Sequence, residues 1–534
     1  LEKNSFIDFF ILNEGEVAAA ELLCCYINKN YCIESLKRSV VRQSLAICEG
    51  ELLVGEAIDR IGVRKGGSVE LRSDKQSHSV SVLDDIPSPY LTGMMDQFFD
   101  NKLYPLVETN RGCPFACTFC QQGVDYFNSV AVRRTDMVEK ELDYVAQKMV
   151  EESPGIARIE FADPNFAMFK QDLKTTECIF RLQEKYGWPK IIGCSTGKNK
   201  PAQVIEAVEK VMPNSLIISN SMQSTNLDTL NEIKRSNISL GAYTQIQSDI
   251  QSRGLRSMAD VILGLPLETK ESHFKAIYSL IDSGVQEFTS YQAMVLKSTE
   301  LEERSSADKY GLVTKSRVLP RAMGLYKINN TVVPVADVET IIVSTETLSF
   351  DDYLSSRVLH LLAGIYHNSG VFNIIDNILK KNDISKSKII SVLHQRVEKK
   401  SSNILLMVDK FIEDTKGELF DTEEECLSFY CNEDNVIRVK NAEIGGNLMW
   451  KYIGLALFKF WESVVDEIII SLRVLLDFDQ NIIDDIRSYL LARVVNVSAK
   501  NIEPSISIKL RTNFISEFTG VYSDNSRFIM SMSD

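Results

Sequence analysis

The 534-residue sequence has no long uninterrupted apolar run, and this excludes an ordinary transmembrane helix. The longest candidates, such as Glu467–Leu476, are short and broken by Arg473, whereas a membrane span needs about 20 apolar residues. A positive net charge is also missing, because 73 acidic against 59 basic residues give a formal charge of −14. Binding of phosphates requires a basic surface, so we expect no nucleic-acid partner.

The sequence also lacks the cysteine pattern of a disulfide framework. Its 11 cysteines are an odd number scattered along the chain, which is typical of a reducing compartment, and we expect a cytoplasmic protein. The 44% hydrophobic and 25% charged residues are those of an ordinary globular protein. A chain of this length is too long for one core, which predicts two or more domains.

Three closely spaced cysteines carry the most information. Cys113, Cys117 and Cys120 follow the pattern Cys-x3-Cys-x2-Cys on a loop that contains glycine and proline. Close thiolates hold metal centres, and three ligands instead of four would leave one position of an iron-sulfur cluster open.

Other interpretations of these cysteines remain open. A zinc site usually needs a fourth Cys or His, and no histidine is nearer in the sequence than His78 and His273. A disulfide is a further alternative, although the chain shows no sign of secretion. Buried cysteines without a metal are the third, but the polar residues of the loop do not resemble an apolar core.

The cysteine spacing, the aromatic Phe119 before the last cysteine and the strand-like residues 103–109 resemble the radical S-adenosylmethionine (SAM) enzymes. This resemblance implies that Cys113, Cys117 and Cys120 bind a [4Fe-4S] cluster and that SAM chelates the fourth iron. It further implies that an electron cleaves SAM and yields a 5′-deoxyadenosyl radical, which removes a hydrogen from an unactivated carbon.

Residues 101 to about 295 alternate apolar runs with amphipathic stretches, which predicts a parallel α/β sheet with right-handed crossovers. The expected strands are Leu106–Thr109, Ile156–Phe161, Lys190–Cys194, Ser215–Ser219, Asp260–Leu263 and Glu287–Tyr291. The expected helices are Thr135–Glu152, Gln171–Tyr186, Pro201–Val211, Leu227–Ser236 and Lys270–Ser283. The fold class is therefore α/β, and the count fits the partial (β/α)6 barrel of the radical SAM superfamily, with chemistry at the carboxyl ends of the strands.

Polar segments that follow these strands resemble the SAM-binding motifs of the family. Besides Phe119, the resemblance assigns to cofactor binding Asp163, Asn165, Ser195, Ser219, Gln223, Ile262 and Gly264. Asp163 and Asn165 correspond to the motif for the SAM amino group, and Gly264 would let the backbone approach the adenine ring. An Asp-Pro turn or ordinary loops and helix caps would also explain these segments.

The first residues resemble the end of another domain. Phe6–Leu12 reads as a buried strand followed by a helix at Val17–Tyr26, whereas Ser44–Val82 reads as a small hairpin or meander. One group of radical SAM enzymes carries a doubly wound cobalamin-binding domain before the cluster domain, and its last strand and helix look like residues 1–35. We therefore expect a cobalamin-domain remnant at 1–35, a β/linker segment at 36–100, the barrel at 101–330 and a helical domain at 331–534.

Long amphipathic segments with few internal glycines predict the mainly helical C-terminal domain. They are Phe350–Asn368, Val371–Leu379, Lys386–Glu398, Ile404–Asp414, Thr422–Tyr430, Leu448–Leu476 and Asn481–Val495.

The resemblance to the cobalamin-containing group implies an enzyme that methylates an unactivated carbon of a small-molecule or peptide substrate. Its implied cofactors are the [4Fe-4S] cluster, SAM and cobalamin, with a flavodoxin or ferredoxin as reducing partner. A radical rearrangement or oxidation without methyl transfer is the alternative within this class. A non-catalytic metal-binding scaffold is the alternative outside it.

Overall fold

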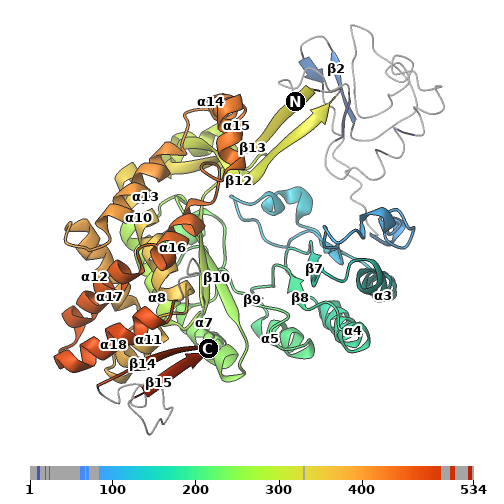
Figure 1. Cartoon of the computed structure of the whole chain (residues 1–534). Helices are drawn as coiled ribbons and strands as arrows, with labels where there is room; N and C mark the ends of the chain where they lie inside the picture. The colour runs from blue at the N-terminus through green and yellow to red at the C-terminus, as the bar shows by residue number, and fades with distance from the viewer. Residues whose placement is uncertain are drawn as a thin grey trace. The chain divides into compact units, whose positions relative to one another are not determined.

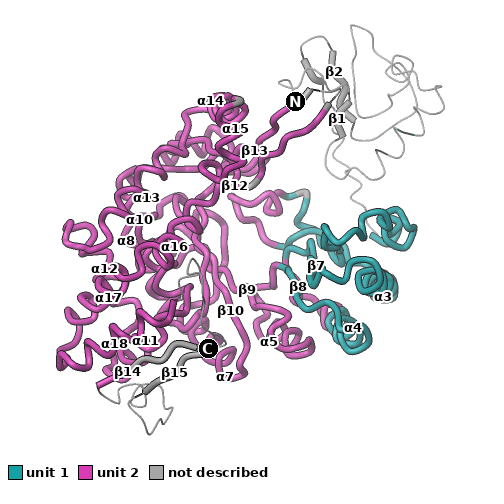
Figure 2. The backbone as a smooth tube through the Cα atoms, viewed as in Figure 1, with its two compact units in different colours: residues 1–114, 125–164, 174–194 teal, residues 115–124, 165–173, 195–534 magenta. Residues whose placement is uncertain are grey.

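The computed structural model describes residues 83–328, 331–494 and 505–511, four short strand segments (9–11, 61–65, 68–70 and 527–531) and residues 19 and 23. The chain divides into two compact units, which Figure 2 colours separately. Unit 1 comprises residues 1–114, 125–164 and 174–194, and unit 2 comprises residues 115–124, 165–173 and 195–534.

Unit 1 contains a three-stranded parallel sheet in the order β4-β7-β8. Its strands are β4 (Leu106–Val107), β7 (Arg158–Phe161) and β8 (Ile191–Gly193), and its long helices are α3 (Thr135–Glu152) and most of α4 (Lys170–Tyr186). The two helices run side by side in Figure 1 and are joined by ion pairs such as Arg181–Glu139. Buried residues of α3 recur every three or four positions, as in Val138, Leu142 and Val145, so one face of the helix packs inward.

Unit 2 contains a second three-stranded parallel sheet, in the order β11-β10-β9. Its strands are β9 (Ile218–Ser219), β10 (Ser257–Leu263) and β11 (Glu287–Gln292). Its helices before the hairpin are α5 (Pro201–Lys210), α6 (Leu227–Glu232), α7 (Leu240–Ser252), α8 (Lys270–Asp282) and α9 (Arg304–Tyr310). Every second residue of β10 is buried, which is the two-residue period of a strand.

The six expected strands of the α/β region all have a counterpart, and within each sheet they pair in parallel as predicted. Two helix predictions were wrong in detail. The helix expected at Leu227–Ser236 ends at Glu232, because Lys234 has a φ of +52°. Helix α7 was not predicted, since its Gln- and Ser-rich sequence shows a weak apolar period. The closed arrangement of a partial barrel remains a prediction.

A long antiparallel hairpin follows the second sheet. It consists of β12 (Val313–Ile328) and β13 (Thr331–Ser344), with an irregular register between Val318 and Met323. The sequence analysis predicted no strands here and placed a domain boundary at residue 330, between the two strands.

The rest of unit 2 is mainly helical. Its helices are α10 (Phe350–Ala363), the π-helix η6 (Gly364–Asn368), α11 (Asn373–Lys381), α12 (Ser387–Glu398), α13 (Leu405–Gly417), α14 (Glu423–Tyr430), α15 (Glu433–Lys440), α16 (Leu448–Phe458), α17 (Trp461–Leu475) and α18 (Gln480–Ala492). The single helix expected at Leu448–Leu476 is in fact two, because the chain breaks at Lys459 and Phe460. Helix α15 was not predicted.

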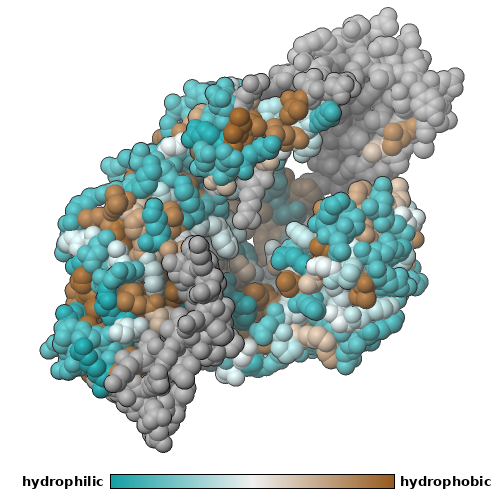
Figure 3. Space-filling model, viewed as in Figure 1, coloured by the Kyte–Doolittle hydropathy of each residue, from teal (hydrophilic) through white to brown (hydrophobic). Residues whose placement is uncertain are grey.

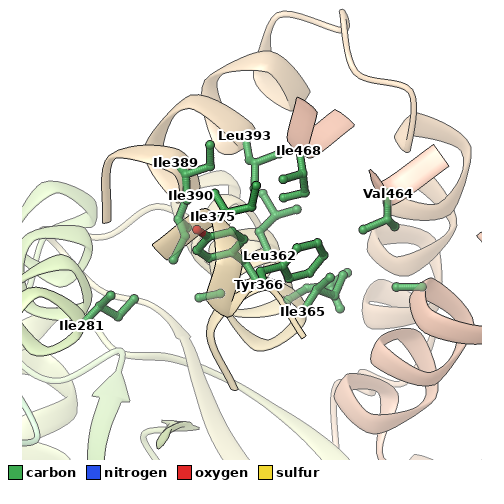
Figure 4. Packing of buried hydrophobic residues seen from close by; sticks show 14 of the residues in the cluster. Ile281, Leu362, Ile365, Tyr366, Ile375, Ile389, Ile390, Leu393, Val464 and Ile468 are labelled. Carbon is green, nitrogen blue, oxygen red and sulfur yellow. The ribbon is translucent and has the colours of Figure 1, made fainter. Parts of the chain in front are cut away.

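One large hydrophobic core joins these helices to the second sheet. It contains Val261 of β10 and Ile281 of α8 together with residues of α10, α11, α12 and α17. Figure 4 shows Leu362, Ile390 and Ile468 of three different helices within this cluster. Burial of so many aliphatic side chains, at about 1.5–3 kcal/mol each, is the main source of stability here.

Figure 3 shows mostly hydrophilic residues on the visible face of unit 2, with scattered apolar patches. In the described part of the chain, no single helix is both long and apolar enough to cross a membrane. One bent pair of segments, Phe350–Asn368 and Asn373–Lys381, passes this test of length and composition only when the two are combined.

The N-terminal predictions fall largely outside the described residues. Strand β1 (Phe9–Ile11) lies in the predicted strand Phe6–Leu12 and pairs antiparallel with β2 (Ile61–Lys65). Strand β2 also pairs with β3 (Ser68–Glu70), which agrees with the small hairpin expected there. The predicted helix at Val17–Tyr26 lies outside the described residues apart from two positions. At the other end, β14 (Ser505–Lys509) and β15 (Arg527–Ser531) form a hairpin.

Candidate functional site

The cysteine loop leaves unit 1 through a constrained backbone turn. Strand β5 (Asn110–Arg111) pairs antiparallel with β6 (Ala131–Val132) just before the loop. Gly112 has a φ of +98°, and a Cβ there would lie 2.3 Å from the Ser129 carbonyl oxygen, so only glycine fits. The amide of Cys113 then donates to the Phe127 carbonyl at 2.8 Å, which fixes this buried cysteine.

The second part of the loop is anchored within unit 2. The Thr118 amide donates to the Ile233 carbonyl after α6, and the Leu301 amide donates to the Thr118 carbonyl, both at 3.2 Å. Cys117 is buried and Cys120 is partly exposed. A Cβ at Gly123 would lie 2.1 Å from the Cys117 carbonyl oxygen, so the backbone closes tightly around Cys117.

The structure does not gather the three sulfurs into a metal-binding group. Among the described residues, no set of three or more His, Cys, Asp or Glu side chains is placed to hold a metal ion. Cys113 belongs to unit 1, whereas Cys117 and Cys120 belong to unit 2. All three are free thiols and thus have the donor chemistry of an iron-sulfur cluster. Their role as cluster ligands stays a prediction.

A partly buried arginine faces the cysteine loop in unit 2. Arg235 places Nη1 3.9 Å from the Cys117 sulfur and donates from Nη2 to the Ser221 carbonyl at 2.6 Å and from Nε to Asn237 Oδ1 at 3.0 Å. Burial lowers the pKa of Arg235, while Cys117, Cys120 and Asp260 act in the opposite direction.

Two acceptor atoms near this arginine lack a protein donor. Asp260, on β10, accepts a short hydrogen bond from Ser221 through Oδ2, but its buried Oδ1 has no partner. The buried Oε1 of Gln223 also has none. Burial raises the pKa of Asp260, with Ser221, Lys198 and Arg235 acting in the opposite direction. A buried acceptor without a donor costs about 1–3 kcal/mol, and a ligand with donor groups would remove this cost.

These residues form a polar group beside the carboxyl end of β9 and the middle of β10, which we call the strand-end cluster. Its members are Cys117, Ser219, Ser221, Gln223, Arg235 and Asp260. Gln223 adopts a φ of +63°, and its amide donates to the Asp260 carbonyl at 2.8 Å, so the backbone holds it beside the middle of β10. A non-glycine residue in this region of φ is strained, and such strain is concentrated at functional sites.

Ser195 and Ser219 lie at the edge of this cluster. Thr196 donates from Oγ1 to the Ser219 carbonyl at 2.7 Å and accepts from the Ser219 amide at 2.9 Å, which joins the two loops. Ser219 Oγ lies 3.4 Å from Ser221 Oγ. Ser195 is exposed and accepts a hydrogen bond from the Phe166 amide through its carbonyl.

The predicted apolar contacts Phe119 and Ile262 share one hydrophobic cluster, which also contains Leu265 and Ile342. Gly264 follows β10 with a φ of +89°, and a Cβ there would lie 3.1 Å from the Ile342 carbonyl oxygen. The positive φ therefore favours glycine here, and the close passage of β13 adds to that preference.

Asp163 is engaged with the start of the cysteine loop. Its carboxylate accepts from the amides of Thr109 (2.8 Å) and Asn110 (3.2 Å), from Asn110 Nδ2 (3.0 Å) and, in a short hydrogen bond, from Thr109 Oγ1. Burial raises the pKa of Asp163 to about 6, although the hydrogen bonds from Thr109 and Asn110 oppose this. Asn165, two residues later, is buried in unit 2.

The sequence analysis missed Arg235, Asn237, Ser221 and Asp260. Arg235 fell inside the helix expected at 227–236, and Asp260 was taken only as the first residue of a strand. An Asp within an apolar strand-like run was the one available signal, since a carboxylate in such a run needs a partner.

Comparison with known proteins adds sequence relatives. The chain is 28% identical over 331 residues to the cobalamin-dependent radical SAM methyltransferase TokK of Streptomyces tokunonensis, over 60% of this chain and 44% of that protein. It is 29% identical over 281 residues to 2-(S-pantetheinyl)-carbapenam-3-carboxylate methyltransferase of Streptantibioticus cattleyicolor, over 51% of this chain and 39% of that protein. The chain thus spans less than half the length of these relatives.

No family model matches the sequence. Among solved structures, the cobalamin-dependent SAM radical enzyme OxsB with aqua-cobalamin bound aligns with a TM-score of 0.44 and 11% identity, over 91% of this chain and 68% of that one. The two sequence relatives confirm the resemblance carried by the cysteine motif: the chain is related in sequence to cobalamin-dependent radical SAM methyltransferases.

Proposed function

We propose that this chain contains the SAM-cleaving part of a cobalamin-dependent methyltransferase that acts on an unactivated carbon of a small molecule. In this proposal Cys113, Cys117 and Cys120 hold a [4Fe-4S] cluster, SAM is the cosubstrate and cobalamin carries the methyl group. The names of the two curated relatives and the three-thiol motif support it. No cobalamin contact is proposed for the described residues.

The strand-end cluster beside Cys117 is the observation that carries the proposal. SAM bears a carboxylate, an ammonium group and ribose hydroxyls. The Arg235 guanidinium has five N–H donors, and the three contacts described above leave donors for a carboxylate. The unpartnered oxygens of Gln223 and Asp260 match the donor groups of the ammonium and the hydroxyls.

The remaining roles follow from the same contacts. When bound, a reduced cluster supplies the single electron for cleavage of SAM. Phe119 and Ile262 offer an apolar surface that excludes water and suits an adenine ring. The Asp163 carboxylate already has four protein donors, so we assign it the positioning of residues 109–110, which lead into the cysteine loop, in place of a direct contact with SAM.

We also propose a reducing cellular setting with a flavodoxin or ferredoxin as electron donor. The seven cysteines among the described residues are all free thiols, and no disulfide joins them. This is what a cytoplasmic enzyme requires.

The first experiment reconstitutes the purified chain with iron and sulfide without oxygen and measures 5′-deoxyadenosine formed from SAM under dithionite. We expect a brown protein that forms this product, and the Cys117→Ala variant should retain little iron and form none. Replacement of Arg235 by methionine should weaken SAM binding by about tenfold or more. The matched variant Arg253→Met, at an exposed ion-paired arginine of the same unit, should bind SAM normally. A colourless zinc protein would contradict the proposal.

A second experiment tests methyl transfer itself. A version of the protein that carries cobalamin is supplied with SAM labelled in its methyl group, and the substrate named for the carbapenam relative is the first candidate. Label in the product supports methylation. Formation of 5′-deoxyadenosine with no label in any product would instead favour a rearrangement or oxidation.

A further inference from the structure

A cavity of about 390 Å³ lies in unit 2 at the amino ends of β10 and β11. Arg256 directly precedes β10, and residues 284–287 lead into β11. Asp260 of the strand-end cluster lies four positions along β10 from Arg256, about 13 Å at a strand rise of about 3.3 Å per residue. The cavity is therefore separate from the proposed SAM site, and its volume lies in the range of small-molecule pockets.

The walls of the cavity are held by side-chain amides. Asn368 accepts from the Phe288 amide at 3.1 Å and donates to the Phe288 carbonyl at 2.8 Å, which fixes η6 against β11. Gln286 accepts from the Ser257 amide at 2.7 Å and donates to the Leu255 carbonyl at 3.2 Å. These clamps act on the backbone, so the cavity is formed before any ligand arrives.

His367 is the buried polar group in this wall whose polar atoms are unused. It lies on the π-helix η6, is 5% exposed, and neither of its ring nitrogens makes a hydrogen bond of ordinary geometry. The centroid of its ring lies 5.9 Å from the centroid of the Phe288 ring, and this contact fixes the orientation of His367. Burial of such a group without a partner costs about 1–3 kcal/mol, and π-helical turns are frequent at functional sites.

Two cations line the cavity that contains His367, and each is paired with a carboxylate. Lys386 lines the cavity with its Nζ paired 2.6 Å from Asp376 Oδ2, so two of its three donors remain available. Arg256 lies on the other wall, paired with Glu287. Asn373, which also lines the cavity, begins α11, and the preceding Phe372 gives that helix no side-chain cap. An uncapped helix start carries partial positive charge and free amides.

The state of the His367 ring follows from the same surroundings. Burial and the nearby charge of Lys386 together lower the pKa of His367 to about 3, although the Val285 carbonyl acts in the opposite direction. The ring is thus neutral at physiological pH and offers one N–H donor beside the ammonium of Lys386. Donors therefore converge from His367, Lys386 and the start of α11.

We propose that this cavity binds a small anionic ligand with a carboxylate or phosphate group, held by Lys386, His367 and the first amides of α11. The proposal does not depend on the chemistry at the cysteine loop. Carboxylates and phosphates share the acceptor oxygens that this arrangement of donors recognises.

The test follows the histidine ring signals of the full chain by NMR during titration with inorganic phosphate and with malonate, and with chloride at matched ionic strength. The sequence has only five histidines, so the signal missing from the His367→Gln variant identifies that ring. We expect a saturable shift of this signal with at least one of the two anions and none with chloride. Phosphate and malonate compared with each other show which oxyanion fits better.

The Lys386→Met variant should weaken the anion affinity by about tenfold or more, since a charge-assisted contact is lost. Lys388→Met is the matched control, because Lys388 is exposed on the same helix and does not line the cavity. Unchanged helical circular dichroism shows that both variants are folded. The proposal is overturned if neither anion gives a saturable shift. It is also overturned if the two lysine variants bind the anion with equal affinity.

Discussion

Acidification should destabilise unit 2 through a buried pair of histidines. His273 of α8 and His360 of α10 place their Nε2 atoms 2.7 Å apart, and both are buried. Burial lowers the pKa of His273 to about 3 and that of His360 well below its usual value, with His273 and Arg357 adding to the effect on His360. Both rings are therefore neutral in the folded chain, one as donor and the other as acceptor.

The sign of the effect follows from proton binding. With folded pKa values below the unfolded value of about 6.5, both rings take up protons on unfolding at any pH below that value. The contribution of the two neutral rings to the free energy of unfolding is thus fully present above pH 6.5 and is lost as the pH falls below this value. For His273 alone, a pKa lowered from about 6.5 to about 3 reduces the free energy of unfolding by about 2 kcal/mol between pH 7 and pH 5. This is a large share of an ordinary domain stability of about 5–15 kcal/mol.

The assay is urea unfolding at pH 7 and pH 5, followed by far-ultraviolet circular dichroism, to which the many helices of unit 2 contribute most of the signal. The double variant His273→Leu with His360→Phe removes both titrating rings. Its loss of stability between the two pH values should be at least about 2 kcal/mol smaller than that of the natural sequence. The control Ile277→Val, at a buried residue of α8, should cost about 1 kcal/mol at both pH values. Equal pH dependence in the double variant and the natural sequence would refute the reasoning.

Two further predictions concern the backbone around the cysteine loop and β10. Asp163→Ala leaves buried amide donors without an acceptor, so we expect a loss of about 2–5 kcal/mol in the urea unfolding of unit 1 and weaker iron binding after reconstitution. Gly264→Ala should cost about 1–3 kcal/mol, because alanine is strained at a φ of +89°. Gly241→Ala, in α7 with no atom near its Cβ position, should be neutral or stabilising by up to about 1 kcal/mol. Equal effects of the two glycine changes would contradict this explanation.

The α/β region was predictable because each of its elements carries its own period. Alternating burial along β10 and the three-to-four spacing of buried residues in α3 were visible as sequence patterns. The hairpin of β12 and β13 was not predictable from the sequence, because Pro320 and Pro334 argue against strands. The structure accommodates Pro320 at the register irregularity between Val318 and Met323, where no ladder pairing is needed.

The candidate site was predictable to a different extent. Three cysteines within eight residues must lie near one another, so their spacing alone reveals a possible metal ligand set. Arg235 is 118 positions from Cys117, and only the fold brings the two together. Its surrounding sequence has the charge and length of an exposed helix end, which is where the sequence analysis placed it. Long-range partners of this kind leave no local pattern.

The two proposed sites of unit 2 can be understood through the cost of unused polar atoms. Gln223 and Asp260 beside the middle of β10, and His367 near its amino end, each keep a buried polar atom without a protein partner. Each such atom costs about 1–3 kcal/mol, whereas an apolar residue of similar shape would cost nothing. A fold of marginal stability keeps such groups where a bound ligand supplies the missing hydrogen bonds. Under our two proposals, occupation of either site by its ligand should therefore stabilise the folded chain.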